Sequence, residues 1–338
     1  MAAYTTINDP EAYFQVQLYT GNGSANNAIT LGGDTDMQPD LVWIKNRDAA
    51  DAPCVFDSVR GATKVLHPDV TNAEATDADT LDSFTSDGFQ VDADEKVNTN
   101  AEKYVAWCWK ESATAGFDIL IYTGTGSAHT ISHNLSAVPH LMIHKGRSDA
   151  YSWITYHHKN TDAPETDHLT IESTTATADS AYEWNDTAPT SSVWTVGSGS
   201  GSNQSTKTYV AYLWTSIQGF SKFGQYEGNG NANGAFVYTG FRPAFVMCKS
   251  TDSTSQWYMF DNKREGANVD VDEESSLGND PLAAEVNTAE ATTAMVDLLS
   301  NGFKFITASD PNVAETYIYM AFAEAPFANS NGVPCNAR

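Results

Sequence analysis

The stretch YVAWCWK, Tyr104–Lys110, is apolar on both of its alternating faces. A strand with one wet face alternates apolar with polar residues, whereas a strand covered on both faces is apolar throughout. The pattern therefore predicts a strand at the centre of its sheet, with one face on a sandwich core and the other on a neighbouring copy or subunit. Similar stretches, YVAYLWT and YIYMAFA, begin at Tyr209 and Tyr317.

Two further patterns recur in the same order as this strand. An apolar run ends in a glycine-rich turn as QLYTGNG, LIYTGTG and GQYEGNG, and a proline opens a short strand as PDLVWIKNR, PHLMIHKGR and PAFVMCKST. Successive copies lie about 100 residues apart, which is the size of a complete small domain and too long for a solenoid repeat. Three patterns with constant order and spacing predict three tandem copies of one design.

Strand signals dominate inside each copy. Many short strands separated by turns predict an all-β fold: three tandem β-sandwich, jelly-roll-like domains of about 100 residues with little helix. Asp87-Gly88 and Asn301-Gly302 are predicted as the centres of two-residue hairpin turns, and each copy is allowed one short helix at most. The predicted division of the chain is an N-terminal arm at 1–13, repeats at 14–113, 114–217 and 218–328, and a C-terminal tail at 329–338.

The strands LVWIK, LMIHK and FVMCK each end in a lysine, at Lys45, Lys145 and Lys249. Because an ammonium group is costly to bury, we expect these side chains at the points where the strands meet water.

Composition and charge narrow the choice of partners. The 338 residues include 41 % hydrophobic residues, which fits a folded protein with cores, and the formal net charge is −25. This charge argues against nucleic acid and against anionic membrane surfaces, since both need basic residues. The chain shows no signal peptide or membrane-span pattern, which predicts synthesis in the cytoplasm and no membrane insertion. We expect Cys54, Cys108 and Cys248 to be reduced and buried, with Cys335 as an exception.

Most histidines fall in the second copy, without the spacing of a metal site. His140 and His144 would lie about 13 Å apart along one strand, although a site that combines strands, such as His144 with His157, stays open. The acidic clusters Asp92–Glu95 and Asp270–Glu274 lack the spacing of a calcium loop, and calcium binding there also stays open. The GSGSGS segment, Gly197–Ser202, lacks the context of a phosphate-binding loop and is predicted to be flexible. We predict no catalytic, cofactor-binding or metal-binding residues, and no cofactor.

Three aromatic residues of the second copy stand in the polar segment YEWNDTAPTSSVW. Tyr182, Trp184 and Trp194 are the candidate binding residues, because exposed rings offer a large rigid contact area to sugars or proteins. The alternative is that the three rings fill the core of the second copy.

The chain resembles a family of marine bacteriophage proteins. The resemblance is carried by LYTGNGS, QPDLVWIKNR, FDSVRGATKVL, TNAEAT, SDGF and YVAWCWK in the first copy, and by FDNKREG and NTAEAT in the third; the ending AFAEAPFANSNGVPCNAR is also similar. Such proteins are mostly virion structural or tail-fibre components. The resemblance therefore implies a virion protein, and it transfers no catalytic residues.

The predicted function is that of a non-enzymatic virion structural protein, most of all a tail-fibre or tail-tip component involved in host attachment. The alternatives are a capsid decoration or head-fibre protein, and a carbohydrate-binding or glycan-depolymerising module. The predicted partners are other virion proteins, further copies of the chain in a homotrimer, and a host surface glycan or protein. The predicted location is the virion, after synthesis in the host cytoplasm.

Overall fold

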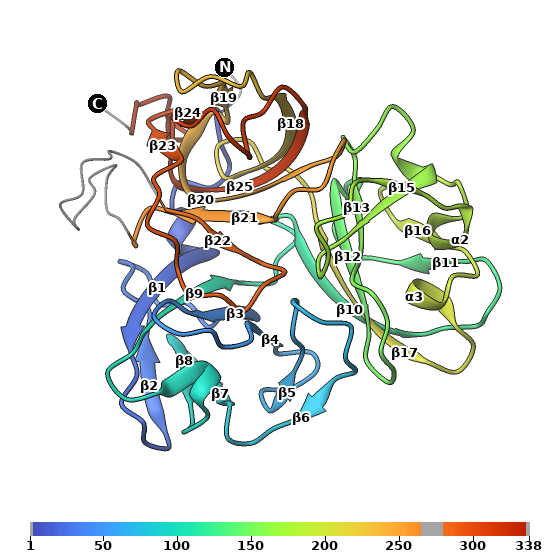
Figure 1. Ribbon diagram of the computed structural model, residues 1–338, viewed down its shortest axis with the longest axis horizontal. Coiled ribbons are helices and arrows are strands. Elements are labelled where there is room, and N and C mark those ends of the chain that lie inside the picture. Colours follow the sequence, from blue (N-terminus) through green and yellow to red (C-terminus); the bar gives the residue numbers. More distant parts are fainter. Residues whose placement is uncertain (1–2, 265–279, 336–338) are drawn as a thin grey trace.

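A computed structural model describes residues 3–264 and 280–335 of the chain. The fold is all-β, with about 6 % helix and 40 % strand in several antiparallel sheets. Figure 1 shows three groups of strands around a common centre: blue to cyan, green to yellow, and orange to red along the sequence. We call them the first, second and third units. They are defined by the ranges 14–109, 117–214 and 221–326.

The elements follow one another in the same general order in each unit. The first unit, preceded by the 3-10 turn η1 (Pro10–Ala12), contains β1 (Phe14–Thr20), β2 (Asn27–Thr30), β3 (Leu41–Asn46), β4 (Cys54–Asp57), β5 (Lys64–Val65), β6 (Ala75–Thr76), β7 (Leu81–Thr85), β8 (Gly88–Val91), α1 (Glu95–Asn98) and β9 (Lys103–Trp109).

The second unit contains β10 (Phe117–Thr123), β11 (His129–Ser132), β12 (Leu141–Gly146), β13 (Ile154–His157), η2 (Pro164–Thr166), β14 (Asp167–Thr170), β15 (Ala178–Asp179), α2 (Ala181–Trp184), β16 (Val193–Val196), α3 (Ser200–Asn203) and β17 (Thr208–Trp214). The third contains β18 (Ser221–Glu227), β19 (Phe236–Tyr238), β20 (Phe241–Ser250), β21 (Tyr258–Asp261), β22 (Leu282–Ala283), β23 (Val296–Leu299), β24 (Gly302–Phe305) and β25 (Thr316–Pro326).

Each unit has a main sheet in which the last strand lies beside the first. The orders are β1-β9-β3-β4, β10-β17-β12-β13 and β18-β25-β20-β21, and the second sheet continues through β14 and β15 and the third through β22. The register is also equivalent: Trp107 of β9, Tyr212 of β17 and Met320 of β25 each pair with one residue on either side. The strand that begins near Tyr104 is therefore central in its sheet, as its pattern predicts.

The two faces of this central strand lie in different cores. Tyr104, Ala106 and Cys108 face a core of the first unit, where the sheet β2-β8-β7 covers them. Val105 and Trp107 face the opposite way into a cluster to which all three units contribute buried side chains. We call this cluster the shared core. It explains why the strand has no polar face.

Aromatic rings join the units directly inside the shared core. The ring centroids of Phe14 and Phe322 lie 5.0 Å apart, those of Trp107 and Phe245 5.5 Å apart, and those of Trp109 and Trp214 6.4 Å apart. Each pair links two different units. Truncation of such a buried ring to alanine typically costs about 3–5 kcal/mol, so the units depend on one another for stability.

Two local predictions need correction. The predicted hairpins form, but Thr85 pairs with Gly88 and Leu299 with Gly302, so each glycine follows the two-residue turn instead of lying in it. Gly88 has the positive φ of 116°, and a side chain there would meet the carbonyl of Ile29. The second unit also contains two short helices, α2 and α3, where at most one was expected.

The described part of the N-terminal arm contacts the third unit and the C-terminal tail, and it contacts the first unit through Asp9 and Glu11. The hydroxyl of Tyr4 donates to the carbonyl of Gly240, and the amide of Asn8 donates to the hydroxyl of Ser330. The described residues near the two ends of the chain therefore contact each other on one side of the molecule (Figure 1).

Candidate functional site

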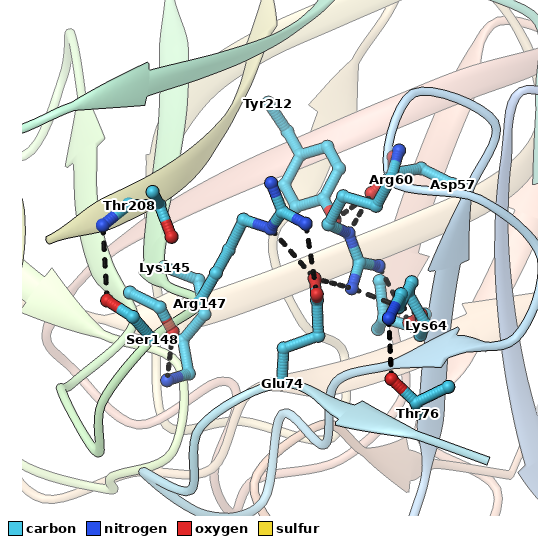
Figure 2. A network of polar contacts seen from close by, with 12 residues as sticks. Asp57, Arg60, Lys64, Glu74, Thr76, Lys145, Arg147, Ser148, Thr208 and Tyr212 are labelled. Carbon is cyan, nitrogen blue, oxygen red and sulfur yellow. Dashed lines mark hydrogen bonds and ion pairs between the residues drawn. The ribbon is translucent and has the colours of Figure 1, made fainter.

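The junction between the first and second units is built on a buried ion pair. Asp57 ends β4, and its carboxylate accepts hydrogen bonds from the Nε of Arg60 and, at 2.7 Å, from the hydroxyl of Tyr212 in the second unit (Figure 2). The guanidinium group of Arg60 also donates to the carbonyls of Val55 and Lys64 at 3.0 and 3.1 Å. The side chains of Asp57 and Arg60 are wholly buried, and each charge has a partner.

Glu74 extends this network across the junction. Its carboxylate pairs with Arg60 at 3.2 Å and with Arg147 of the second unit at 2.8 and 3.0 Å, and its backbone N–H donates to the carbonyl of Arg147 (Figure 2). Burial alone would raise the pKa of Glu74, but the hydrogen bonds from Arg147 and the charge of Arg60 outweigh it and lower the pKa. Two acids and two arginines thus form one neutral group.

The junction between the third and first units repeats the same chemistry. Arg264 donates through Nε to Asp261 at 2.6 Å and pairs with Glu290, which in turn accepts from Arg47 of the first unit at 2.6 Å. The indole N–H of Trp107 donates to Asp261 at 3.2 Å, in the place that Tyr212 takes at the other junction. We call these two contacts the ionic junctions.

At the junction between the second and third units, the four places of this network carry uncharged side chains. His157 and Asn160 occupy the places of the aspartate and arginine, and Thr177 occupies the place of the glutamate, since its N–H donates to the carbonyl of Thr251 in the third unit at 3.0 Å. The Nε2 atom of His157 is 3.2 Å from the carbonyl oxygen of Tyr319. Burial lowers the pKa of His157 well below its usual value, with the nearby charge of His158 as a smaller cause. We call this contact the neutral junction.

The lysines at the strand ends are buried, not in water as the sequence suggested. Lys145 donates to the carbonyl of Thr71 at 3.0 Å across one ionic junction, and Lys45 donates to the carbonyl of Val286 at 2.5 Å across the other. Lys249, at the neutral junction, donates to the carbonyl of Ser250 in its own unit. Burial lowers the pKa of each of the three ammonium groups to about 8. Backbone carbonyls replace the water that these groups would otherwise need.

The three predicted binding aromatics do not form one surface. Tyr182 is 67 % exposed, but Trp184 and Trp194 are each 1 % exposed and lie in the core of the second unit. The indole N–H of Trp184 donates to the carbonyl of Asp167 at 3.0 Å, which satisfies its polar atom inside the protein. The two tryptophans are therefore unavailable to a partner in solution, and a binding role for Tyr182 stays a prediction.

The histidines of the second unit are spread over both faces of its main sheet. His144 packs against Trp184 in the core of that unit, whereas His157 pairs with Leu141 on the face of the shared core. Residues on opposite faces of a sheet cannot bind one ion together. The His140 and His158 rings stack 4.1 Å apart. Among the residues that the structure describes, no group of three His, Cys, Asp or Glu side chains is arranged to hold a metal ion.

Other segments singled out in the sequence have structural contacts. In Asp92–Glu95, Asp94 caps α1 and pairs with Lys96 at 3.0 Å. The cluster Asp270–Glu274 lies outside the described residues. Gly197–Ser202 was expected to be flexible, but Gly197, Gly199, Gly201 and Ser202 are buried.

The junction residues were missed in the sequence, although a signal for them exists. FDSVRG and FDNKREG supply the aspartate and arginine of the two ionic junctions, and NAEAT and NTAEAT supply the glutamate. These blocks recur in the first and third units and are absent from the second, where the neutral junction begins. Recurrence of charged residues, and not of apolar ones alone, would have identified them.

One comparison with known proteins gives a match over nearly the whole chain. A sequence model for one family, described as a domain of unknown function (DUF7483), matches residues 9–326, and this single match extends over all three units. A search of curated proteins finds no match. In the described ranges, no helix is long and apolar enough to cross a membrane.

Proposed function

The chain belongs to the family described as a domain of unknown function (DUF7483), and from this premise we propose that it is a non-enzymatic structural protein of a bacteriophage particle. The proposal starts from the resemblance of its sequence blocks to marine phage virion proteins. The observation that supports it best is the shared core with its three polar junctions, since a particle component must keep one shape while it contacts neighbours. A shared, densely packed core resists such deformation.

The finer division of the fold is part of this proposal. The three units are taken as three tandem, jelly-roll-like sandwich domains with boundaries at 14–113, 114–217 and 218–328. Their equivalent main sheets and strand registers favour this reading. Their shared core means that none of them exposes its inner face in the intact chain.

Within the particle, we propose a tail-fibre or tail-tip position with a role in host attachment. Turns and short sheets of each unit lie away from the shared core, which leaves them available to outside partners (Figure 1). The exposed ring of Tyr182 belongs to this outer surface. Other virion proteins and a host surface glycan or protein are the proposed partners, with a homotrimer as the assembled state.

A capsid decoration or head-fibre protein is the second candidate, and one observation favours it. The three main sheets repeat the same strand order around one core, so a single chain has an approximate threefold arrangement. Such a chain matches a symmetric site on a capsid without forming a trimer itself.

Labelling of intact particles tests the proposal. Cys335 is exposed, whereas Cys54, Cys108 and Cys248 are buried, so a maleimide-gold probe on purified phage particles marks the C-terminal end of the chain. Particles that carry Cys335→Ser supply the background from other virion thiols. Specific label at the tail supports the attachment role, label on the head replaces it with the decoration role, and absence of the chain from purified particles by mass spectrometry overturns the virion proposal.

A further inference from the structure

A hollow of about 350 Å³ lies in the second unit beside its junction with the first. Its lining includes Tyr151, Ser152, His168, Glu183 and Ser200 of the second unit and Thr71 of the first. Ala150 and Ser200 on its rim are exposed, so the hollow is open to solvent. The volume is within the range of small-molecule sites and is sufficient for one sugar ring.

Glu183 is the unusual residue of this hollow. It is 9 % exposed, and its Oε2 atom is fully buried without a hydrogen-bond partner in the described protein. Burial raises the pKa of this carboxyl, an effect that a hydrogen bond with Ser202 and the charge of His168 offset only in part. The Nδ1 atom of His168 is likewise buried without a partner. Unpaired polar atoms of this kind are costly, so a hydrogen-bond donor beside Glu183 would lower the free energy of the folded protein.

Comparison with the first unit shows how the second unit differs at this place. The N–H of Asp92 donates to the carbonyl of Thr80, as the N–H of Gly197 donates to the carbonyl of Glu183, so Thr80 and Glu183 occupy equivalent places. Thr80 is fully buried, and its hydroxyl is satisfied at 2.8 Å by the carbonyl of Asp77. The first unit thus has a buried residue with a satisfied hydroxyl where the second has a carboxylate whose Oε2 atom has no partner.

Glycines in the second unit provide the space for this carboxylate. Gly199 caps α3 where Asp94 caps α1, and Gly201 follows two residues later where the first unit has Lys96. A side chain at Gly199 would come within 2.7 Å of Glu183 Oε1. In place of the ion pair between Asp94 and Lys96, the second unit therefore has two glycines, and the carboxylate of Glu183 packs against Gly199.

From this geometry we infer that the hollow binds a neutral sugar residue, with Glu183 accepting hydrogen bonds from ring hydroxyls. Hydroxyl groups of Thr71, Ser152 and Ser200 supply both donors and acceptors, which suits a ligand with several hydroxyls better than an ammonium group. The ring of Tyr151 and the side chain of Ile154 supply apolar surface for the C–H face of the sugar. An anionic ligand is disfavoured by Glu183 and by the net charge of −25.

The inference names a class of ligand for the proposed attachment role. It rests on that role only for the source of the sugar, which would be the host surface. Binding is a property of the isolated chain, whereas the virion role is tested on particles. A negative binding result therefore leaves the assembly proposal intact, and label absent from particles leaves the binding result intact.

Saturation-transfer difference NMR on the full chain tests the inference with a panel of neutral hexoses and N-acetylhexosamines, together with a uronic acid, methylammonium and calcium chloride in competition. We expect transfer from the protein to at least one neutral sugar. Glu183→Gln is expected to weaken that binding at least tenfold, and Ala150→Trp, on the exposed rim, to abolish it. Phe236→Ala is the matched control, because this exposed ring of the third unit does not line the hollow, and it is expected to bind as the parent does.

A second measurement separates loss of a ligand contact from loss of the fold. Because the buried Oε2 atom of Glu183 has no partner without ligand, Glu183→Gln is expected to raise the unfolding midpoint while it weakens binding. The inference is overturned if no neutral sugar gives transfer at millimolar concentration, or if methylammonium or calcium displaces the bound sugar. It is also overturned if Glu183→Gln and Ala150→Trp bind as the parent does, or if Phe236→Ala is the variant that loses binding.

Discussion

The ionic junction between the first and second units and the neutral junction between the second and third occupy equivalent places but use different groups. Asp57, Arg60 and Glu74 meet Arg147 at the first, whereas uncharged side chains take all four places at the second. The same backbone hydrogen bond crosses both junctions, at 2.9 Å from Glu74 to Arg147 and at 3.0 Å from Thr177 to Thr251. The packing of the units therefore does not require the ions.

At each junction, the residues of the two facing units match each other in charge. The second unit lacks the aspartate, arginine and glutamate on the face toward the third unit, and the third unit has Thr251 where the other two have an arginine. A change on one side alone would have left a buried charge without a partner, which costs far more than a matched neutral contact. We infer that the charged residues of the ionic junctions determine which faces of the units pair with each other. The shared core supplies the free energy that stabilises the fold.

The largest expected effect comes from removal of a buried guanidinium group. Arg60→Met and Arg264→Met each leave an aspartate buried without its main partner, and we expect a loss of about 3–5 kcal/mol in the free energy of unfolding. Urea denaturation measures it. Asn160→Ala, at the equivalent place in the neutral junction, removes one hydrogen bond and should cost about 1 kcal/mol. Equal losses in the free energy of unfolding for the three variants would show that the buried ion pairs contribute no more than the neutral hydrogen bond.

Acid should weaken the neutral junction before the ionic ones. The folded-state pKa of His157 lies below the unfolded value of about 6.5, so its contribution is complete above that pH and is lost as the pH falls below it. The lowered pKa of Glu74 means that its contribution is lost only below about pH 4.5.

Between pH 6.5 and 5.0, the free energy of unfolding of the parent should fall relative to that of His157→Gln, with a slope that rises to about 1.4 kcal/mol per pH unit at the acid end. His140 and His158 titrate in both proteins, since burial lowers their pKa values too, and their effect cancels in the difference. Parallel stability curves for the two proteins would mean that His157 does not titrate as a buried group.

The smallest expected effect concerns the outer pair of an ionic junction. The side chain of Arg147 is 19 % exposed, so Arg147→Met should cost about 0.5–1 kcal/mol at low salt and less in 1 M sodium chloride. Thr251→Val is its counterpart at the neutral junction, and its cost should not change with salt. Equal salt dependence in the two variants would remove the electrostatic distinction between the junctions.

The all-β fold and the place of the central strand were predictable because apolar periodicity is local. Tyr104–Lys110 shows in seven residues that both of its faces are covered. The alternation of buried Trp194 and Val196 with Thr195 was also visible, and it could have placed this tryptophan in the core. The polar residues that flank Trp194 in the sequence suggested instead that its side chain is exposed.

The junctions were not predictable from local pattern, because their partners lie far apart in the chain. Asp57 meets Tyr212, and Lys45 meets the carbonyl of Val286, only after the units have packed together. The hollow beside Glu183 was missed for a related reason: its two aromatic neighbours in sequence, Tyr182 and Trp184, drew the prediction, and the glutamate between them carries the unpaired atom.

Calorimetric unfolding of the full chain tests the shared core most directly. Since the three units bury their central strands against one another, heating should give one transition, with calorimetric and van't Hoff enthalpies that agree. Two or three separate transitions, or a van't Hoff enthalpy about three times smaller than the calorimetric one, would show that the units unfold independently and would contradict the account.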